Sequence, residues 1–492
     1  MASTTDDLEP STADLTGSLL IGGDRIDRSS GGARVHIFPG TGRPNGTVQL
    51  AGADEIDRAV ESSRIAQREW MSFTADRRRD LLIDLADAVH ERMAEFSRLN
   101  VHDYGVPVSL AINTLLLERF LRHFAGYVDK PHGLSTPAAG SFDLNLIERE
   151  PYGVVGVIAP WNGALVVAAS CVAPALAAGN AVVFKPSVSA PYAALRFGEL
   201  CTEVGLPPGL VNVVPAEAEG GDALVRHGGI RKIHFTGGGV TARKVLAAAA
   251  ENLVPVVAEL GGKSANIVFG DADLDAAAQL SAYQGPLVQS GQSCACASRV
   301  LVHESVYDSF LEKFVAAVES ARVGHPFDPS VIFGPVVSAT DAERILGVID
   351  RAVSTGAGEL LTGGKRMGGD LAAGYYIEPT VFGNVDNRSD LARTETFGPV
   401  VSVMKFADEA EAVGTANDSP YGLNAFIQTT DLARAHRVAR SLHAGSIWIN
   451  QVSDISPQGP YGGYKHSGFG RTGGLDGLYE FMQVKNIRIG MG

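Results

Sequence analysis

Short apolar runs rich in Val and Ile recur along the chain, and between them apolar residues fall at helical spacing. In the first half these runs predict buried strands at residues 154–158, 181–184, 211–214, 232–235 and 256–258. The intervening segments predict helices at residues 165–178, 193–204 and 241–253. Because strands alternate with helices, we expect right-handed βαβ units that build a doubly wound parallel sheet.

The same alternation returns after residue 294 and predicts a second domain of similar architecture. Strands are expected at residues 300–302, 400–404 and 446–449. Helices are expected at residues 306–321, 341–355 and 433–442. The predicted fold class is therefore α/β, with two doubly wound Rossmann-like domains.

Three other patterns complete the prediction. Residues 75–99 predict one amphipathic helix, because apolar side chains recur at helical spacing at Leu82, Leu85, Val89, Met93 and Phe96. Residues 363–374 are glycine-rich and predict a surface loop. Apolar and polar residues alternate at 142–149 and 484–489, which predicts an antiparallel pair of strands that projects from the body.

Residues 151–184 carry no charge and are long enough in principle to cross a bilayer. Pro160, Pro174 and Gly179 interrupt this segment, however, and a spanning helix must satisfy its own backbone groups. A buried strand, a helix of small residues and a second buried strand are the better interpretation. We therefore expect no membrane partner.

The chain has 492 residues, of which 45% are hydrophobic and 20% charged, so more than one domain is expected. A formal charge of -14 argues against a nucleic-acid partner, which would need a basic face. Residues 1–9 carry acids where a presequence would carry bases, so we expect a disordered tail without a targeting signal.

The chain has four cysteines, Cys171, Cys201, Cys294 and Cys296, too few for a disulfide framework in a chain of this length. This count favours a reducing compartment, with the cytoplasm as the default. Cys294 and Cys296 could oxidise or bind a soft metal, but no further Cys or His stands nearby at ligand spacing, so we expect no metal site.

Two segments carry candidate chemistry, Gln289-Ser-Gly-Gln-Ser-Cys294 and Glu259-Leu-Gly-Gly-Lys-Ser264. A thiolate can add to a carbonyl, a carboxylate can activate water, and glycines let a cofactor approach the backbone. Together they indicate a thiol-dependent oxidoreductase. An isolated Cys is more often a small buried hydrophobe, and an isolated strand-end Glu is more often solvated.

The two segments resemble those of the aldehyde dehydrogenase superfamily, and the resemblance covers nearly the whole chain. Five more motifs follow the family's order: Pro160-Trp-Asn162, Lys185-Pro-Ser187, Phe235-Thr-Gly237, Glu395-Thr-Phe397-Gly-Pro399 and Pro460-Tyr-Gly-Gly-Tyr-Lys-His-Ser-Gly468. The resemblance implies the fold of that family: two Rossmann-like domains with a small antiparallel β element for oligomerisation. It also implies an aldehyde substrate and a homodimer or homotetramer.

The resemblance assigns the catalytic set to Cys294, Glu259, Asn162 and Lys185. Cys294 would form a thiohemiacetal and then a thioester, Asn162 would donate to the oxyanion with the Cys294 backbone N–H, and Glu259 would activate the hydrolytic water. Relatives that pass the acyl group to coenzyme A typically lack this acid, so a hydrolytic ending is favoured. A coenzyme A-acylating dehydrogenase and a thiol esterase without redox chemistry remain alternatives.

The resemblance implies NAD or NADP as cofactor, with NAD favoured. The implied cofactor-binding residues are Ile158, Pro160, Trp161, Lys185, Ser187, Val188, Gly237, Gly238, Gly261, Glu395 and Phe397. Gly238 stands where a Ser is usual, so a hydroxyl toward the pyrophosphate is missing. Val188 stands where NAD-preferring relatives carry a Glu that repels a 2′-phosphate, so NADP use is open.

The substrate pocket is expected to be wide, because Gly163 and Ala164 replace Phe-Pro and Ser170 replaces a Trp found in relatives. The expected lining residues are Gly163, Val166, Val167, Ser170, Ser293, Ala295 and Tyr461. We expect a bulky apolar or aromatic aldehyde, unless other side chains refill the space. Leu475 also replaces an acid found in some relatives.

The chain is expected to divide into three parts. Residues 1–134 and 151–260 would form the nucleotide-binding domain, and residues 261–463 the catalytic domain. Residues 135–150 and 464–492 would form the oligomerisation or bridging element.

Overall fold

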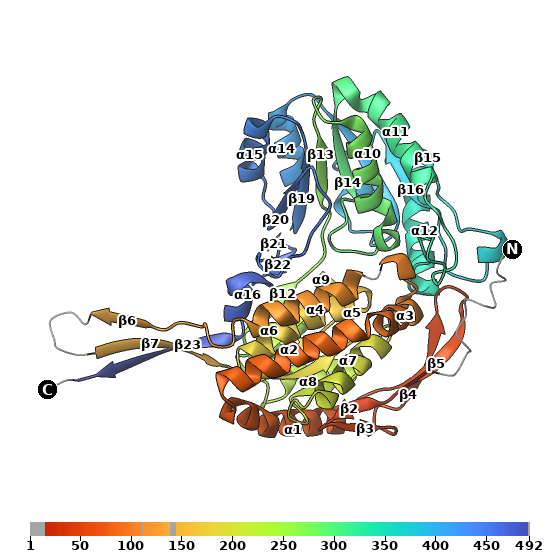
Figure 1. Ribbon diagram of the computed structural model, residues 1–492. Helices are drawn as coiled ribbons and strands as arrows, with labels where there is room; N and C mark the ends of the chain where they lie inside the picture. The colour runs from red at the N-terminus through yellow and green to blue at the C-terminus, as the bar shows by residue number, and fades with distance from the viewer. Residues whose placement is uncertain (1–14, 111, 138–143, 491–492) are drawn as a thin grey trace.

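A computed structural model of the protein describes residues 15–110, 112–137 and 144–490. The expected tail at residues 1–9 lies outside this part. Two lobes of mixed helix and strand lie one above the other in Figure 1, and a long antiparallel arm extends from the lower lobe. Two large sheets with parallel cores confirm the predicted α/β class.

The lower lobe is built on an eight-stranded sheet of order β22-β12-β11-β8-β9-β10-β2-β3. Its five central strands are mutually parallel: β8 (Val154–Ile158), β9 (Ala181–Lys185), β10 (Val211–Val213), β11 (Lys232–Thr236) and β12 (Val256–Glu259). They match the predicted strands. The sequence pattern did not predict the antiparallel edge strands β2 (Leu19–Ile21), β3 (Asp24–Ile26) and β22 (Gly468–Phe469).

Helices cover both faces of this sheet, because its central strands are apolar on both sides. One face packs against α1 (Ala53–Ser72), α8 (Ala218–Arg226) and α9 (Gly239–Glu251). The opposite face packs against α2 (Ala75–Glu91), α3 (Met93–Tyr104), α4 (Ile112–Ala125), α5 (Ala164–Val167), α6 (Ala173–Ala177) and α7 (Tyr192–Glu203). These two layers form the two apolar cores of the lobe.

Two helix predictions in this lobe need correction. The single helix expected at residues 75–99 is two helices, α2 and α3, which are broken at Arg92 with φ -110° and ψ 21°. The helix expected at 165–178 is helical throughout, but residues 168–172 form a π-helical turn in which Ala173 N–H donates to Ala168 O. Neither Gly nor Pro marks the break at Arg92, and the small residues of the wide turn give no periodic signal.

The upper lobe is built on a seven-stranded sheet of order β15-β16-β17-β14-β13-β19-β20. Its strands are β13 (Ala265–Val268), β14 (Arg299–His303), β15 (Glu359–Thr362), β16 (Thr380–Gly383), β17 (Val400–Phe406), β19 (Asn424–Gln428) and β20 (Ser446–Ile449). All neighbours pair in parallel except β15 with β16. The predicted second doubly wound sheet is therefore present.

Helices also cover both faces of the upper sheet. One face carries α10 (Leu274–Ala282) and α11 (Tyr307–Glu319), and the other carries α12 (Ala339–Ser354), α13 (Asp390–Arg393), α14 (Glu409–Asn417) and α15 (Leu432–Ser441). The segment 363–374 is irregular and mostly exposed, as predicted.

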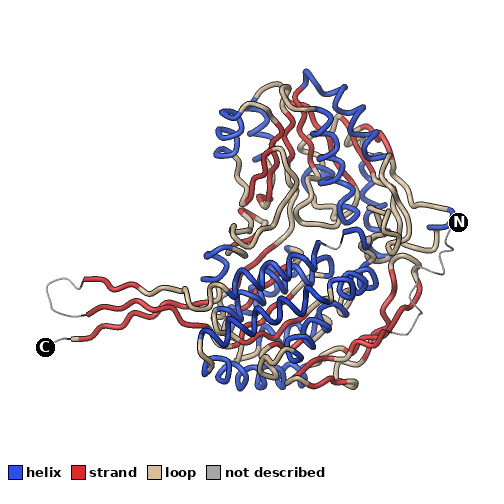
Figure 2. The backbone as a smooth tube through the Cα atoms, in the orientation of Figure 1, coloured by secondary structure: helices blue, strands red, loops and turns tan. Residues whose placement is uncertain are grey.

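The arm is a three-stranded antiparallel sheet of β6 (Leu134–Pro137), β7 (Leu144–Pro151) and β23 (Met482–Ile489). It extends away from the body in Figures 1 and 2. The pairing of β23 with β7 confirms the expected antiparallel pair for the residues that the structure describes. The short α16 (Gly474–Tyr479) leads into β23. The exact division of the chain into domains stays a prediction.

Three further strands lie near the N-terminus in a separate sheet, β1 (Leu15–Gly17), β5 (Arg43–Gln49) and β4 (Ala33–Phe38). The two-residue strands β18 (Tyr421–Gly422) and β21 (Tyr464–Lys465) pair beside the upper lobe. Within the described ranges, no helix combines the length and apolar composition that spanning a bilayer requires.

Candidate active site

A cavity of about 480 Å³ is lined by residues of both lobes. The lower lobe contributes residues that follow the carboxyl ends of its strands, such as Asn162 after β8, Gly237 after β11 and Glu259 at the end of β12. The upper lobe contributes residues that precede its strands, such as Cys294 before β14 and Glu395 before β17. Residues far apart in the sequence therefore meet in one place.

Cys294 lies at the end of a loop whose backbone is held from several sides. Gln289 and Ser290 have left-handed φ values of 49° and 55°, and Gly291 follows with φ 70°. A Cβ at Gly291 would lie 2.1 Å from Gly398 O, so only Gly fits there. The Gln292 side chain accepts from Val337 N–H at 2.9 Å and donates to Pro335 O at 3.2 Å. The loop therefore holds the sulfur in a fixed place.

The Cys294 thiol is in an environment that resists ionisation. Burial raises its pKa to about 11, and the carboxylates of Glu395 and Glu259 add to this rise. The Tyr461 hydroxyl, 3.9 Å from Sγ, is a hydrogen-bonding partner that opposes the rise. Activation of the thiol therefore depends on few groups.

Glu259 is buried in the wall of the cavity, unlike a solvated residue at the end of a strand. Neither carboxylate oxygen has a hydrogen-bond partner among the described residues. Burial raises the pKa of Glu259 well above its ordinary value, although Arg471 opposes this shift. A carboxyl group with a raised pKa is suited to accept a proton near neutral pH.

Asn162 lies in the 3-10 turn Trp161–Gly163, directly after β8. Its side-chain Nδ2 donates to Gln292 O at 3.0 Å, which ties the amide to the loop that carries Cys294. The Asn162 amide, the Cys294 sulfur and the Glu259 carboxylate all line the same cavity. This arrangement suits addition of a thiolate to a carbonyl whose oxygen is held by the amide.

A second cavity of about 340 Å³ lies in the lower lobe beside the ends of β8 and β9. Four predicted cofactor residues line it: Ile158, Lys185, Ser187 and Val188. Burial lowers the pKa of Lys185 to about 8. The Lys185 ammonium donates to Pro186 O at 3.4 Å.

The larger cavity contains the other predicted cofactor residues, namely Pro160, Trp161, Gly237, Gly238, Gly261, Glu395 and Phe397. Glu395 accepts from Gly262 N–H at 2.9 Å, and a Cβ at Gly261 would lie 1.9 Å from the Glu395 carboxylate. Phe397 has φ 48°, and its ring meets Trp161 edge-on with centroids 5.6 Å apart.

These two cavities fit a dinucleotide. Both open at the carboxyl ends of parallel strands, where such ligands bind in doubly wound folds. Helix α9 begins after Gly238, where a Cβ would meet nothing within 4 Å, so its free N–H groups are accessible to a phosphate. The sequence prediction missed Thr241 and Lys244 of α9 and Glu217, which also line the smaller cavity. Thr241 and Lys244 lie on a helix surface and Glu217 directly precedes α8, and neither position gave a distinct signal.

Outside the loop that carries Cys294, Tyr461 is the predicted pocket residue with a described contact to the sulfur, because its hydroxyl lies 3.9 Å from Cys294 Sγ. Val167 and Ser170 are instead buried in or beside the core of the lower lobe, and the Ser170 hydroxyl donates to Val166 O at 2.9 Å. None of the seven predicted pocket residues lines either of the two cavities described above: Gly163, Val166, Val167, Ser170, Ser293, Ala295 and Tyr461. The expected aldehyde pocket therefore stays a prediction.

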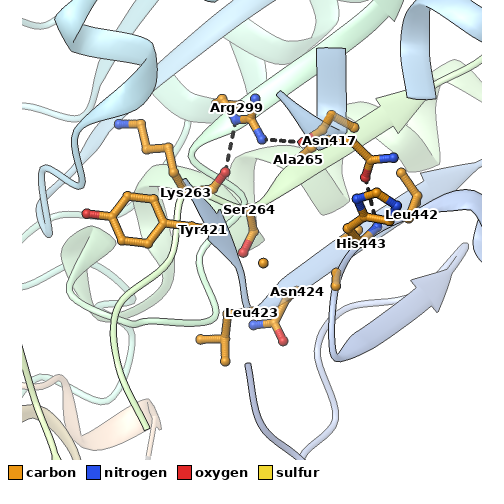
Figure 3. Close-up of a pocket in the computed structure, with 14 residues that line it drawn as sticks. Lys263, Ser264, Ala265, Arg299, Asn417, Tyr421, Leu423, Asn424, Leu442 and His443 are labelled. Atoms are coloured by element: carbon orange, nitrogen blue, oxygen red, sulfur yellow. Dashed lines mark hydrogen bonds between the residues drawn. The ribbon is translucent and has the colours of Figure 1, made fainter. Parts of the chain in front are cut away.

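A small cavity of about 20 Å³ lies in the upper lobe, where residues of β13, β14 and β19 contribute to its lining (Figure 3). Lys263 and Arg299 contribute to its lining, and Arg299 donates to Lys263 O at 2.9 Å. The Lys263 ammonium is buried without a hydrogen-bond partner among the described residues, and burial lowers its pKa to about 8. Lys263 stands in a motif that the sequence prediction used, but no role was predicted for it.

No cluster of three or more His, Cys, Asp or Glu side chains within the described ranges is placed to bind a metal ion. Cys296 is buried, and burial raises the pKa of its thiol.

The fold and the site define the class of this protein: an enzyme of two doubly wound lobes, with a cysteine and a carboxylate in one cavity beside a second cavity at the ends of parallel strands. The chain belongs to the aldehyde dehydrogenase family, whose family model matches residues 27–487. This confirms the resemblance inferred from the motifs. The protein is an oxidoreductase that acts on the aldehyde group.

Solved structures support the same assignment. A betaine aldehyde dehydrogenase from Staphylococcus aureus, in complex with NAD⁺, is 34% identical with a TM-score of 0.94 and covers 97% of this chain and 95% of its own. PnpE from Pseudomonas sp. WBC-3, in complex with nicotinamide adenine dinucleotide, is 37% identical with a TM-score of 0.93. That match covers 97% of this chain and 98% of PnpE.

Proposed function

We propose that this enzyme oxidises an aldehyde to its carboxylic acid with NAD or NADP, through a covalent intermediate on Cys294. The observation that carries the proposal is that Cys294, Glu259 and Asn162 line one cavity, next to a second that suits the adenosine half of a dinucleotide. The test is an aldehyde panel with NAD and NADP in parallel, followed by the absorbance of the reduced cofactor. No reduction with any aldehyde would contradict it.

Each residue has a distinct task in the proposed cycle. Cys294 Sγ bonds to the carbonyl carbon, and Asn162 Nδ2 with the Cys294 backbone N–H donates to the oxyanion of the resulting thiohemiacetal. Nicotinamide, when bound, would supply the two-electron acceptor for oxidation of this adduct to a thioester. Glu259 then takes a proton from water, the water oxygen bonds to the thioester carbon, and the carbon–sulfur bond breaks to release the acid.

The buried Glu259 favours hydrolysis as the ending over transfer to coenzyme A. A carboxylate with a raised pKa beside the thiol can deprotonate a water molecule there. We expect full turnover without coenzyme A. Turnover that requires added coenzyme A would show the acylating reaction instead, and product release without cofactor reduction would show an esterase.

The choice between NAD and NADP depends on the charge in the smaller cavity. Val188 provides no acid to repel a 2′-phosphate, and the cavity's two carboxylates, Glu217 and Asp222, are each paired with an arginine. Lys244 lines the same cavity and forms no ion pair among the described residues. We therefore expect NADP to be accepted alongside NAD, the cofactor bound in the related structures.

The substrate is a bulky apolar or aromatic aldehyde. Small residues after Asn162 support this, since a Cβ at Gly163 would have Val166 at 3.5 Å as its nearest neighbour. We expect a higher kcat/KM for an aromatic aldehyde than for acetaldehyde. An equal or higher value for acetaldehyde would refute this assignment.

The arm provides the surface for assembly into a homodimer or homotetramer. Leu134 and Val484 on its strands are 63% and 60% exposed, which is unfavourable for apolar residues in an isolated chain. Light scattering after gel filtration should give the mass of two or four chains.

Four free thiols support a reducing compartment, for which the cytoplasm is our assignment.

A further inference from the structure

The immediate surroundings of the Cys294 sulfur contain acids and one hydroxyl. Glu259 of the lower lobe and Glu395 of the upper lobe oppose formation of a negative charge on the Cys294 sulfur. Cys296, two residues away, is a buried thiol without a charge to offer. The Tyr461 hydroxyl is the side-chain group described within hydrogen-bonding distance of the sulfur, at 3.9 Å.

The Tyr461 hydroxyl has a second contact, which sets its direction. Asn424, the first residue of β19, is 3% exposed, and its Nδ2 donates to the Tyr461 oxygen at 3.1 Å. A hydroxyl that accepts from an amide keeps its own hydrogen for another acceptor. The Cys294 sulfur is such an acceptor when it is a thiolate.

The other end of the Asn424 amide explains why Nδ2 faces Tyr461. Asn424 and Ser264 line the small cavity of Figure 3, which at about 20 Å³ has room for a single water molecule. Asn424 Oδ1 and Ser264 Oγ both lack a partner among the described residues. With Oδ1 on the side of the cavity, the amide oxygen can accept a hydrogen bond there from a water molecule or from the Ser264 hydroxyl. The nitrogen is thereby left to face Tyr461.

We propose that Tyr461 donates its hydroxyl hydrogen to the Cys294 thiolate and that Asn424 is the positioning residue that fixes this direction. Tyr461 is then a catalytic residue that favours the ionised form of Cys294. Strand β19 contributes through Asn424, which holds the Tyr461 hydroxyl in this orientation. The inference rests on the proposed role of Cys294 as nucleophile. It assigns Tyr461 a task beyond lining a substrate pocket.

The test is the pH dependence of Cys294 alkylation by iodoacetamide in the full-length protein, with the modified residue identified by mass spectrometry. Tyr461→Phe keeps the ring and removes the hydroxyl. We expect its thiol pKa to rise by about one unit, so that alkylation near neutral pH slows about tenfold, in the range of a hydrogen bond to a charged group. An unchanged or lower thiol pKa would overturn the proposal.

Two Asn424 variants test the direction of the hydrogen bond. Asn424→Ala removes the amide donor, and we expect a smaller rise in the thiol pKa than in Tyr461→Phe. Asn424→Asp keeps the shape of the side chain but offers only acceptors when ionised. The Tyr461 hydrogen should then turn away from the sulfur toward the new carboxylate. We expect the thiol pKa to rise at least as much as in Asn424→Ala. Normal alkylation in both Asn424 variants would refute the positioning role.

Tyr376→Phe is the matched control, because Tyr376 is a fully buried tyrosine whose hydroxyl lacks a partner among the described residues. Its Cys294 alkylation should equal that of the wild type. Circular dichroism and melting temperature identify a variant that fails to fold, and the remaining variants then decide.

Turnover after alkylation is a separate measurement. If alkylated Cys294 leaves turnover intact, the proposed function fails, whatever the role of Tyr461.

Discussion

The two sheets contribute to the site from opposite ends of their strands. In the lower sheet, Asn162, Lys185 and Glu259 stand at or after the carboxyl ends, where doubly wound folds usually bind ligands. In the upper sheet, Cys294 and Glu395 precede strands and so lie at the amino ends. In the function we propose, the same architecture therefore serves two purposes, with one sheet forming the cofactor cleft and the other carrying the nucleophile.

At the carboxyl end of β13 in the upper sheet, the polar groups are paired within the protein. Asp271, after β13, accepts from Thr429 Oγ1, Thr430 N–H and Asp431 N–H, and it pairs with Arg434 at 2.6 Å. These contacts use the polar groups that a ligand would otherwise meet. The chemistry of an edge is thus decided by its loops rather than by the direction of its strands.

The largest expected effect separates the two sheets directly. Cys294→Ala removes the nucleophile from the upper lobe, and we expect turnover to fall by about a thousandfold or more. The lower lobe is untouched, so calorimetry should show NAD binding within about twofold of wild type by the same reasoning. Loss of nucleotide binding together with turnover would show that the two lobes do not act separately.

Glu259→Gln tests the carboxylate of the lower lobe. Loss of a general base should lower steady-state turnover by about a hundredfold or more. A rapid-mixing experiment should still show one burst of reduced cofactor, because the step that fails comes after the thioester forms. Absence of the burst would mean that Glu259 acts earlier.

The same residue gives a prediction for pH. The raised pKa of Glu259 means that the folded protein holds a proton that the unfolded chain loses near the ordinary value of 4.5. Between that value and the higher folded pKa, the contribution of Glu259 to the free energy of unfolding falls as pH rises. Turnover should rise over the same interval. Melting curves of wild type and Glu259→Gln should therefore diverge with rising pH, with the variant more stable.

Asn162→Ala tests the proposed hydrogen bond from the Asn162 amide to the oxyanion. The same amide connects the two lobes through its hydrogen bond to Gln292 O. Removal of one such donor lowers kcat by about a hundredfold to a thousandfold in other acyl-transfer enzymes, and we expect a similar loss here. The melting temperature should change little, because the lost contact is one hydrogen bond to the Gln292 carbonyl. Single-turnover kinetics should show slower acylation, and an unchanged acylation rate would exclude the role.

The smallest expected effect concerns the adenosine cavity of the lower lobe. Val188→Glu should weaken binding of 2′,5′-ADP about tenfold relative to ADP, since a carboxylate would face the 2′-phosphate. Lys244→Met should weaken the same ligand by about threefold, the size expected for an exposed charge. Calorimetry with both ligands measures this without turnover, and equal losses for both nucleotides would contradict the assignment.

The central strands of the lower sheet could be predicted because their Val and Ile runs are buried on both faces, as could β14, β17 and β20 of the upper sheet. The parallel strands β13, β16 and β19 of the upper sheet were not predicted. The edge strands β2, β3 and β22 could not be predicted, since strands of two or three residues carry no periodicity. The motifs indicated Cys294, Glu259 and Asn162 as a group. The contact between Asn424 and Tyr461 joins residues 37 positions apart and depends on how β19 meets the segment before β22, which no local pattern reveals.

One edge of the lower sheet also has a consequence for biosynthesis. Strand β22 pairs with β12, placing Gly468 opposite Glu259, so this sheet is completed by a segment that the ribosome makes after the entire upper lobe. Until then the β12 edge has open backbone groups available to other chains. A chain that stops before residue 468 should therefore be prone to aggregate, even though most of its cofactor-binding lobe has already been synthesised.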